Sequence, residues 1–143
     1  MEYTLIIDPQ KAESIVLTVH ERNETVEAVE RLVGSKSDIL TAYGEYDAVR
    51  FSVNDAECFF TDANKVYTFV GNKKYLLKQR LYQIEECINA DFVKINQGCI
   101  INVRRVKKFD MSFGGTIKVV LQNGFEDYIS RRQLKNVKRR FGI

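Results

Sequence analysis

The sequence has a single histidine, and it lacks the residue patterns that catalytic sites need. His20 lies in an acidic stretch, and no Ser-His-Asp, Cys-His, metal-ligand or phosphate-loop pattern occurs along the chain. Acid–base and nucleophilic mechanisms require clustered ionisable groups whose pKa values are tuned to one another. We therefore predict that the protein is not an enzyme and that it has no catalytic residue, metal site or cofactor.

Cysteine is also scarce, and long apolar runs are missing. Cys58, Cys87 and Cys99 are odd in number and have no Cys-x-x-Cys spacing, so we expect free thiols rather than disulfides or a zinc site. No stretch approaches the roughly 18 apolar residues of a membrane span, and no basic segment at the start marks a signal peptide. These absences predict a cytoplasmic protein with no direct insertion into a membrane.

Charge of both signs is abundant but unevenly distributed. Residues 1–63 carry five basic and thirteen acidic side chains, whereas residues 64–143 carry seventeen basic and six acidic ones. A basic half of this size attracts anionic partners, which include nucleic acids, membrane surfaces and acidic substrates. Charge alone therefore defines a class of partner and leaves its identity open.

The length and composition fit one compact domain with a short extension. Residues 1–45 predict a small β-β-α-β unit, with strands over 3–7 and 15–19, a helix over 26–33 and a strand over 39–43. The helix has candidate caps at Asn23, Thr25 and Gly34. The apolar positions of this unit are too few for a core of its own. We expect it to pack on the rest of the chain or on another copy.

Residues 46–143 alternate short apolar strands with turn residues. Strands are predicted over the segments 49–53, 58–61, 66–70, 75–77, 92–95, 100–103, 109–113, 117–121 and 128–129. Two helices interrupt them, one carrying Leu81, Ile84 and Ile88 on its apolar face and one that begins after Ser130. The pattern predicts an α+β fold that is mainly antiparallel sheet with two helices.

The start of the last helix carries an unexpected charge. Ser130 is a candidate N-cap, and Gln133 completes a capping-box pattern three residues later. Arg131 and Arg132 then occupy the first turn, where each cation opposes the helix dipole at a cost of about 0.3 to 1 kcal/mol. An anionic partner at this helix start would gain both backbone N–H groups and guanidinium forks. The alternative is that the two arginines are simply solvated.

A second polar cluster interrupts the strand that begins near Phe92. Asn96 and Gln97 are followed by Gly98, and their amides have the geometry that contacts an adenine edge with two hydrogen bonds. A plain turn has similar residues, but this segment has a high density of basic neighbours, which suits a phosphate backbone. Those neighbours are Lys94, Arg104, Arg105, Lys107 and Lys108.

Four segments of residues 46–143 form a recognisable series: Tyr75-Leu76-Leu77, Phe92-Val93-Lys94-Ile95-Asn96-Gln97-Gly98-Cys99-Ile100-Ile101-Asn102, Leu121-Gln122-Asn123-Gly124 and Ile129-Ser130-Arg131-Arg132. In order and spacing, these segments resemble the LytTR-type DNA-binding domain of bacterial regulators. The chain departs from the family pattern at Lys94, Asn96 and Gly98, where Arg, His and Ser are usual.

The resemblance implies a sequence-specific regulator of transcription that reads the major grooves of double-stranded DNA through loops. Three loop regions would make the contacts, and they carry Asn64 and Lys65, then Asn96 and Gln97, then Arg131, Arg132 and Gln133. Residues 1–45 are similar to the extension of stand-alone LytTR regulators.

Residues 1–45 carry nine acidic and four basic side chains, so we expect them to lie away from the DNA and to form a homodimer. An alternative is that they only cover an exposed sheet edge. A different class of function is a protein-interaction module that partners a membrane-bound regulator through this segment. RNA binding is a further alternative, although exposed aromatic pairs on a sheet are not evident.

Overall fold

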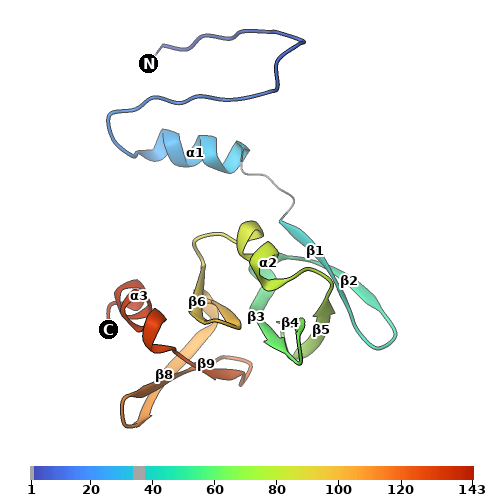
Figure 1. Cartoon of the computed structure of the whole chain (residues 1–143), viewed down its shortest axis with the longest axis vertical. Helices are drawn as coiled ribbons and strands as arrows, with labels where there is room; N and C mark the ends of the chain where they lie inside the picture. Colours follow the sequence, from blue (N-terminus) through green and yellow to red (C-terminus); the bar gives the residue numbers. More distant parts are fainter. Residues whose placement is uncertain (1, 34–37) are drawn as a thin grey trace. The chain divides into compact units, whose positions relative to one another are not determined.

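The computed structural model describes residues 2–33 and 38–143. The chain divides into two units, Met1–Lys36 and Ser37–Ile143 (Figure 1). The first unit contains helix α1 (Glu24–Val33). The side-chain oxygen of Asn23 accepts a hydrogen bond from the Val26 N–H at 3.1 Å, which confirms Asn23 as the helix cap. The expected cap at Gly34 lies outside the described residues.

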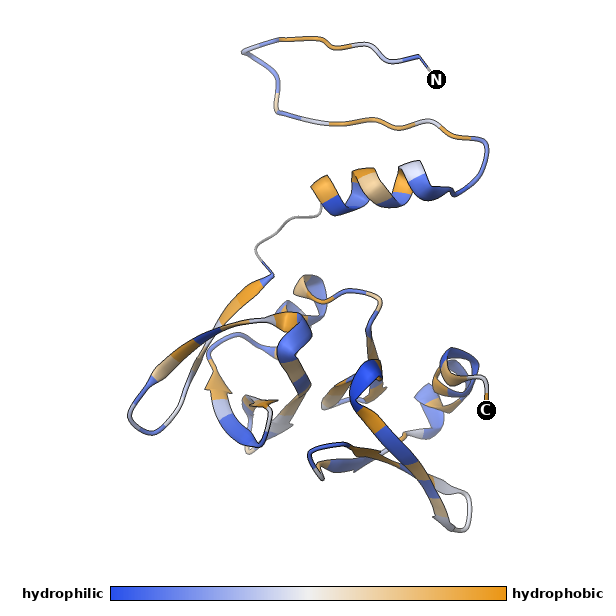
Figure 2. Ribbon diagram, turned by 180° about the vertical axis from the view of Figure 1, so that it is seen from behind, coloured by the Kyte–Doolittle hydropathy of each residue, from blue (hydrophilic) through white to orange (hydrophobic). Residues whose placement is uncertain are grey.

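The two strands predicted in the first unit are wrong. Residues 3–7 and 15–19 are extended, but they form no ladder with any described segment. Their side chains stay exposed, at 91% for Tyr3, 84% for Ile7 and 88% for Val16, and Figure 2 shows the apolar stretches as open runs of chain. Alternation of apolar residues identifies the face that a strand would bury, but a strand also needs a hydrogen-bonding partner.

The second unit is built on two antiparallel sheets. The larger sheet has the order β2-β1-β5-β4-β3-β7-β6, and the smaller has the order β10-β9-β8. The larger sheet contains β1 (Ile39–Tyr43), β2 (Ala48–Ser52), β3 (Ala56–Asp62), β4 (Lys65–Val70), β5 (Lys73–Leu77), β6 (Phe92–Asn96) and β7 (Cys99–Asn102). The smaller contains β8 (Val106–Phe113), β9 (Thr116–Leu121) and β10 (Glu126–Tyr128). The predicted α+β class is confirmed.

Strand β1 does not belong to the extension, where the β-β-α-β interpretation had it. All five of its residues pair with β2, and Tyr43 also pairs with Leu76 of β5. Leu40 and Ala42 are buried in the core of the second unit. The alternating apolar side chains of β1 are therefore buried by a sheet whose other strands come later in the sequence.

Two helices and two short 3-10 turns complete the second unit. Helix α2 (Leu81–Cys87) packs against β3, and helix α3 (Arg131–Phe141) packs against β6 (Figure 1). The 3-10 turn η1 (Val53–Asp55) connects β2 to β3, and η2 (Val103–Arg105) connects β7 of the larger sheet to β8 of the smaller. No helix in the described part of the chain is long and apolar enough to cross a membrane.

The core has two clusters, one on each side of the larger sheet's last strands. One includes Phe59, Ile84 and Ile100 and lies under α2, and the other includes Ile95 and Val137 and lies under α3. All three cysteines are free, as predicted. Two of them, Cys58 and Cys99, belong to the second cluster, and burial raises the pKa of both thiols.

Candidate nucleic-acid interface

Two of the three predicted loops lie side by side because β3 and β7 are antiparallel neighbours. Phe60 of β3 pairs with Cys99 of β7, so the turn after β3 and the turn before β7 are at the same end of the sheet. The Thr61 N–H donates to the Gly98 carbonyl at 2.8 Å, and the Thr61 hydroxyl lies 3.4 Å from the same oxygen. We call this end of the second unit the loop edge, defined by residues 61–65, 96–99 and 130–133.

The start of α3 is hydrogen-bonded to the same edge. The Ser130 N–H donates to the Ile95 carbonyl at 2.9 Å, and the Ser130 hydroxyl accepts from the Gln133 N–H at 3.3 Å. The N-cap predicted at Ser130 is therefore confirmed. Its backbone N–H, which a capping box would direct to the Gln133 side chain, instead connects the helix to β6.

Asn96 joins the second loop to the start of α3 and is buried, with 6% of its surface exposed. Its Nδ2 donates to the Tyr128 carbonyl at 2.9 Å, and its Oδ1 accepts from the Gly98 N–H at 2.9 Å. Both ends of the amide are thus engaged within the protein. The adjacent Gln97 is exposed. The Asn96 amide therefore holds the turn, whereas the Gln97 amide is accessible from solvent.

The turn between β3 and β4 presents Asn64 and Lys65. Ala63 and Asn64 have φ values of +49° and +65°, and Asp62 pairs with Lys65 across the turn. Two successive positive φ values are those of the tight hairpin turns that match strand twist. Asn adopts this conformation readily, whereas Ala does so at a cost. Both Asn64 and Lys65 are exposed.

Thr61 is a residue of the loop edge that no sequence pattern had identified. A Cβ at Gly98 would lie 2.5 Å from the Thr61 hydroxyl oxygen, which is closer than real Cβ contacts allow. The serine usual in the family at this position would therefore displace Thr61. Gly98 and Thr61 are complementary, and a contact between residues 37 positions apart leaves no local signal in one sequence.

Helix α3 carries cations and no carboxylate. Arg131 and Arg132 are exposed in its first turn, and Gln133 is half-buried beside them. Further along the helix the exposed cations are Lys135, Lys138, Arg139 and Arg140. The Arg140 guanidinium donates to the Ala90 carbonyl. A helix of this charge creates a strongly positive surface at and beyond its start.

Three predicted contact residues are not at the loop edge. Lys94 forms an ion pair with Glu85 of α2, with 2.8 Å between Nζ and Oε1. Arg104 and Arg105 follow β7 at its opposite end, which is roughly 13 Å from Gly98 at about 3.3 Å per residue. The structure therefore groups Asn64, Lys65, Asn96, Gln97, Arg131, Arg132 and Gln133, and it separates Arg104 and Arg105 from them.

The described residues contain no group of His, Cys, Asp and Glu side chains that could hold a metal ion. The family model of the LytTr DNA-binding domain matches residues 46–142. The chain is 28% identical to an uncharacterized HTH-type transcriptional regulator of Staphylococcus aureus strain NCTC 8325, over all of this chain and 99% of that protein. A counterpart in the bovine strain RF122 is 27% identical over the same shares.

A solved LytTr DNA-binding domain from Bacillus cereus has the same fold, with a TM-score of 0.68 at 16% identity. The match covers 75% of this chain and 99% of that domain. Paired antiparallel sheets with a basic loop edge, together with these matches, define a β-rich DNA-binding domain. The chain belongs to the LytTR family. It is a DNA-binding protein of transcription regulation, and the family is not enzymatic.

Proposed function

We propose that the protein is a sequence-specific regulator that reads the major grooves of double-stranded DNA with its loop edge. The observation that carries this proposal is the set of hydrogen bonds from Thr61, Asn96 and Ser130, which hold three loops together. These bonds preorganise the exposed side chains of the edge, so little conformational entropy is lost on binding. The proposed contact residues are Asn64, Lys65, Gln97, Arg131, Arg132 and Gln133.

The chemistry of these side chains suits direct reading of bases. A guanidinium fork donates two hydrogen bonds to guanine, and a glutamine amide makes two bonds to adenine. Cations further along α3 are suited to the phosphate backbone, which contributes affinity without sequence information. Asn96 is assigned a positioning role, because its side-chain Nδ2 and Oδ1 already form hydrogen bonds within the protein.

The test compares three variants in competition mobility shifts between the operator and random DNA of equal length. Arg132→Ala and Gln97→Ala should each lose about 1 to 3 kcal/mol of discrimination, because each removes base-edge contacts. Lys138→Ala is the matched control, since loss of a phosphate contact should weaken binding to both DNAs equally. If discrimination is intact in all three variants, the assignment of the reading residues is wrong.

We also propose that the first unit, which is the part of residues 1–45 that precedes β1, mediates a homodimer in the cytoplasm. Apolar side chains in the first unit are exposed without cover, including Leu5 at 76%, Ile6 at 78% and Ile15 at 67%. Exposed strips of this kind mark interaction surfaces. The alignment with the staphylococcal relatives spans this segment, so it is shared beyond the DNA-binding domain. Two copies would align two loop edges on repeated half-sites.

Sedimentation velocity of the full chain tests this second proposal. The native chain should be dimeric at tens of micromolar, and Ile6→Asp combined with Val16→Asp should make it monomeric, because charges would enter an apolar interface. Tyr46→Asp is the control, since Tyr46 is 93% exposed on the second unit. A native chain that is monomeric at this concentration would exclude dimerisation and favour a different partner, such as a membrane-bound regulator.

A further inference from the structure

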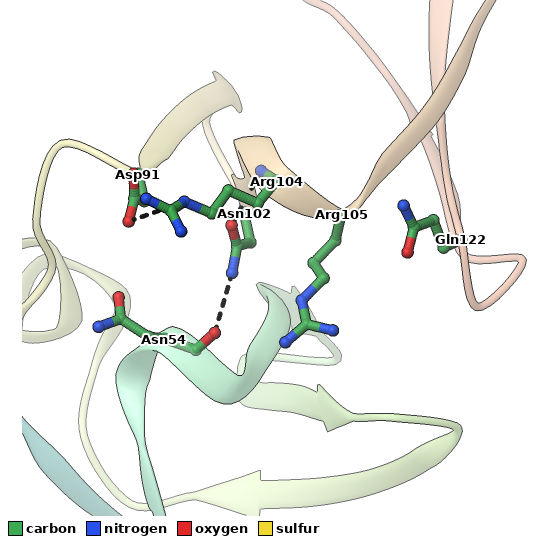
Figure 3. A pocket seen from close by; sticks show the side chains of 6 residues that line it. All are labelled: Asn54, Asp91, Asn102, Arg104, Arg105 and Gln122. Carbon is green, nitrogen blue, oxygen red and sulfur yellow. Dashed lines mark hydrogen bonds and ion pairs between the residues drawn. The ribbon is translucent and has the colours of Figure 1, made fainter.

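Figure 3 shows a polar pocket of about 350 Å³ in the second unit. It lies at the end of β7 opposite the loop edge. Six residues line it: Asn54, Asp91, Asn102, Arg104, Arg105 and Gln122. Its size is at the lower end of the range for small-molecule sites. The lining includes two guanidinium groups and one carboxylate, so the charge of the pocket is positive.

Asn102 builds the pocket floor and is 1% exposed. Its Nδ2 donates to the carbonyls of Asn54 and Ala56, at 3.2 and 3.0 Å, and its Oδ1 accepts from the Arg104 N–H at 3.0 Å. These bonds connect η1 to the start of η2. They hold the backbone next to Arg104 and Arg105, and Figure 3 shows the Asn102–Asn54 bond and the Arg104 side chain reaching toward Asp91.

The two arginines are only loosely paired within the protein. The Arg104 Nε lies 3.4 Å from an Asp91 carboxylate oxygen, and the Arg104 side chain is 76% exposed. The Arg105 Nη1 lies 3.7 Å from a carboxylate oxygen of Glu57, which is too long for a hydrogen bond. Most of the ten guanidinium N–H donors of the pair therefore have no protein acceptor among these contacts.

Two further lining residues carry side-chain amides, which have both donors and an acceptor. The Asn54 side-chain oxygen accepts from the Asn89 amide at 2.8 Å, which leaves the Asn54 NH₂ group for the pocket. Gln122 is exposed, and its backbone N–H donates to the Arg105 carbonyl at 2.8 Å. Behind Arg105, burial raises the pKa of Glu57, and the Arg105 charge opposes this shift.

We infer that this pocket binds a small, acceptor-rich anion, either a phosphate monoester or a compact polycarboxylate. Planar guanidinium forks match both groups, and each has enough oxygens to accept from Arg104, Arg105 and the Asn54 amide together. The site stands apart from the proposed DNA contacts, since its residues lie at the other end of β7. It also touches η2 and the end of β9, so an anion there contacts both sheets.

The test is a titration of the full ¹⁵N-labelled chain with inorganic phosphate, and separately with citrate, against sodium chloride of equal ionic strength. Saturable shifts should appear at the amide signals of Asn54, residues 102–105 and Gln122. Arg104→Gln should raise the phosphate dissociation constant about tenfold, because it removes one charged fork. Arg50→Gln is the control, since Arg50 is an exposed arginine of β2 outside both the pocket and the loop edge, and it should leave the constant unchanged.

Three results would overturn the inference. Shifts confined to the loop edge would show that the phosphate only imitates DNA, and shifts that follow ionic strength without saturating would show no site. A loss of DNA affinity in Arg104→Gln as large as that in Arg132→Gln would make Arg104 a DNA contact. A normal DNA affinity in Arg132→Gln would count against the proposed function alone, since the phosphate titration does not depend on it.

Discussion

The affinity for DNA should fall about a thousandfold between 50 and 200 mM salt. Seven exposed cations lie at the loop edge and along α3, and one of them, Arg140, already donates to the Ala90 carbonyl. The other six are Lys65, Arg131, Arg132, Lys135, Lys138 and Arg139. Each cation that neutralises a phosphate releases a counterion and contributes about −0.9 to the slope of log affinity against log salt. Six contacts predict a slope near −5. Fluorescence anisotropy with a labelled duplex over this range of salt measures it.

Two substitutions locate the contacts that produce the slope. Lys138→Gln should reduce its magnitude by about 0.9, since one phosphate contact is lost. Lys73→Gln is the matched control, because Lys73 is exposed after the β4–β5 turn, at the opposite end of the sheet from the loop edge. A slope near zero in the native protein would exclude DNA as the partner. An equal change in both variants would mean that the DNA is not bound at this edge.

Asn96→Ala should lower the free energy of unfolding by about 2 kcal/mol and weaken DNA binding more than tenfold. The substitution removes two buried hydrogen bonds and leaves the Gly98 N–H and the Tyr128 carbonyl without their side-chain partner. The second loop and the start of α3 then lose one of the hydrogen bonds that join them, while the backbone bond from Ser130 to Ile95 remains, so Gln97 and Arg132 are held less rigidly. Chemical denaturation and anisotropy at a temperature where the variant is folded measure the two effects.

Asn102→Ala is the control that separates stability from positioning. It also removes a buried amide, with three hydrogen bonds, and it should cost about 3 kcal/mol of stability. Asn102 lies at the far end of β7, however, so DNA affinity of the folded variant should stay close to that of the native protein. If the two variants lose DNA affinity equally, Asn96 has only a structural role.

Much of the second unit could be predicted from the sequence because its signals are local. The apolar segments of β3, β4 and β9 with their flanking turns, the apolar face of α2 and the cap at Ser130 depend on residues close in sequence, and the structure confirms them. Similar apolar segments over residues 3–7 and 15–19 form no strands. A strand forms only where a second segment supplies hydrogen bonds, and the pattern of one segment does not name that partner.

The strand and helix segments of residues 46–143, the division of charge and the basic start of α3 can all be identified from the order of residues. Folding, in contrast, places β1 in the larger sheet, buries Asn96 while Gln97 is exposed, and brings Arg104 and Arg105 to a pocket away from the loop edge. The two groups of features differ in how far along the chain the interacting residues lie. Periodicity, capping and charge are properties of neighbouring residues, whereas these outcomes depend on hydrogen bonds such as those from Thr61 to Gly98 and from Asn96 to Tyr128, which join residues more than thirty positions apart.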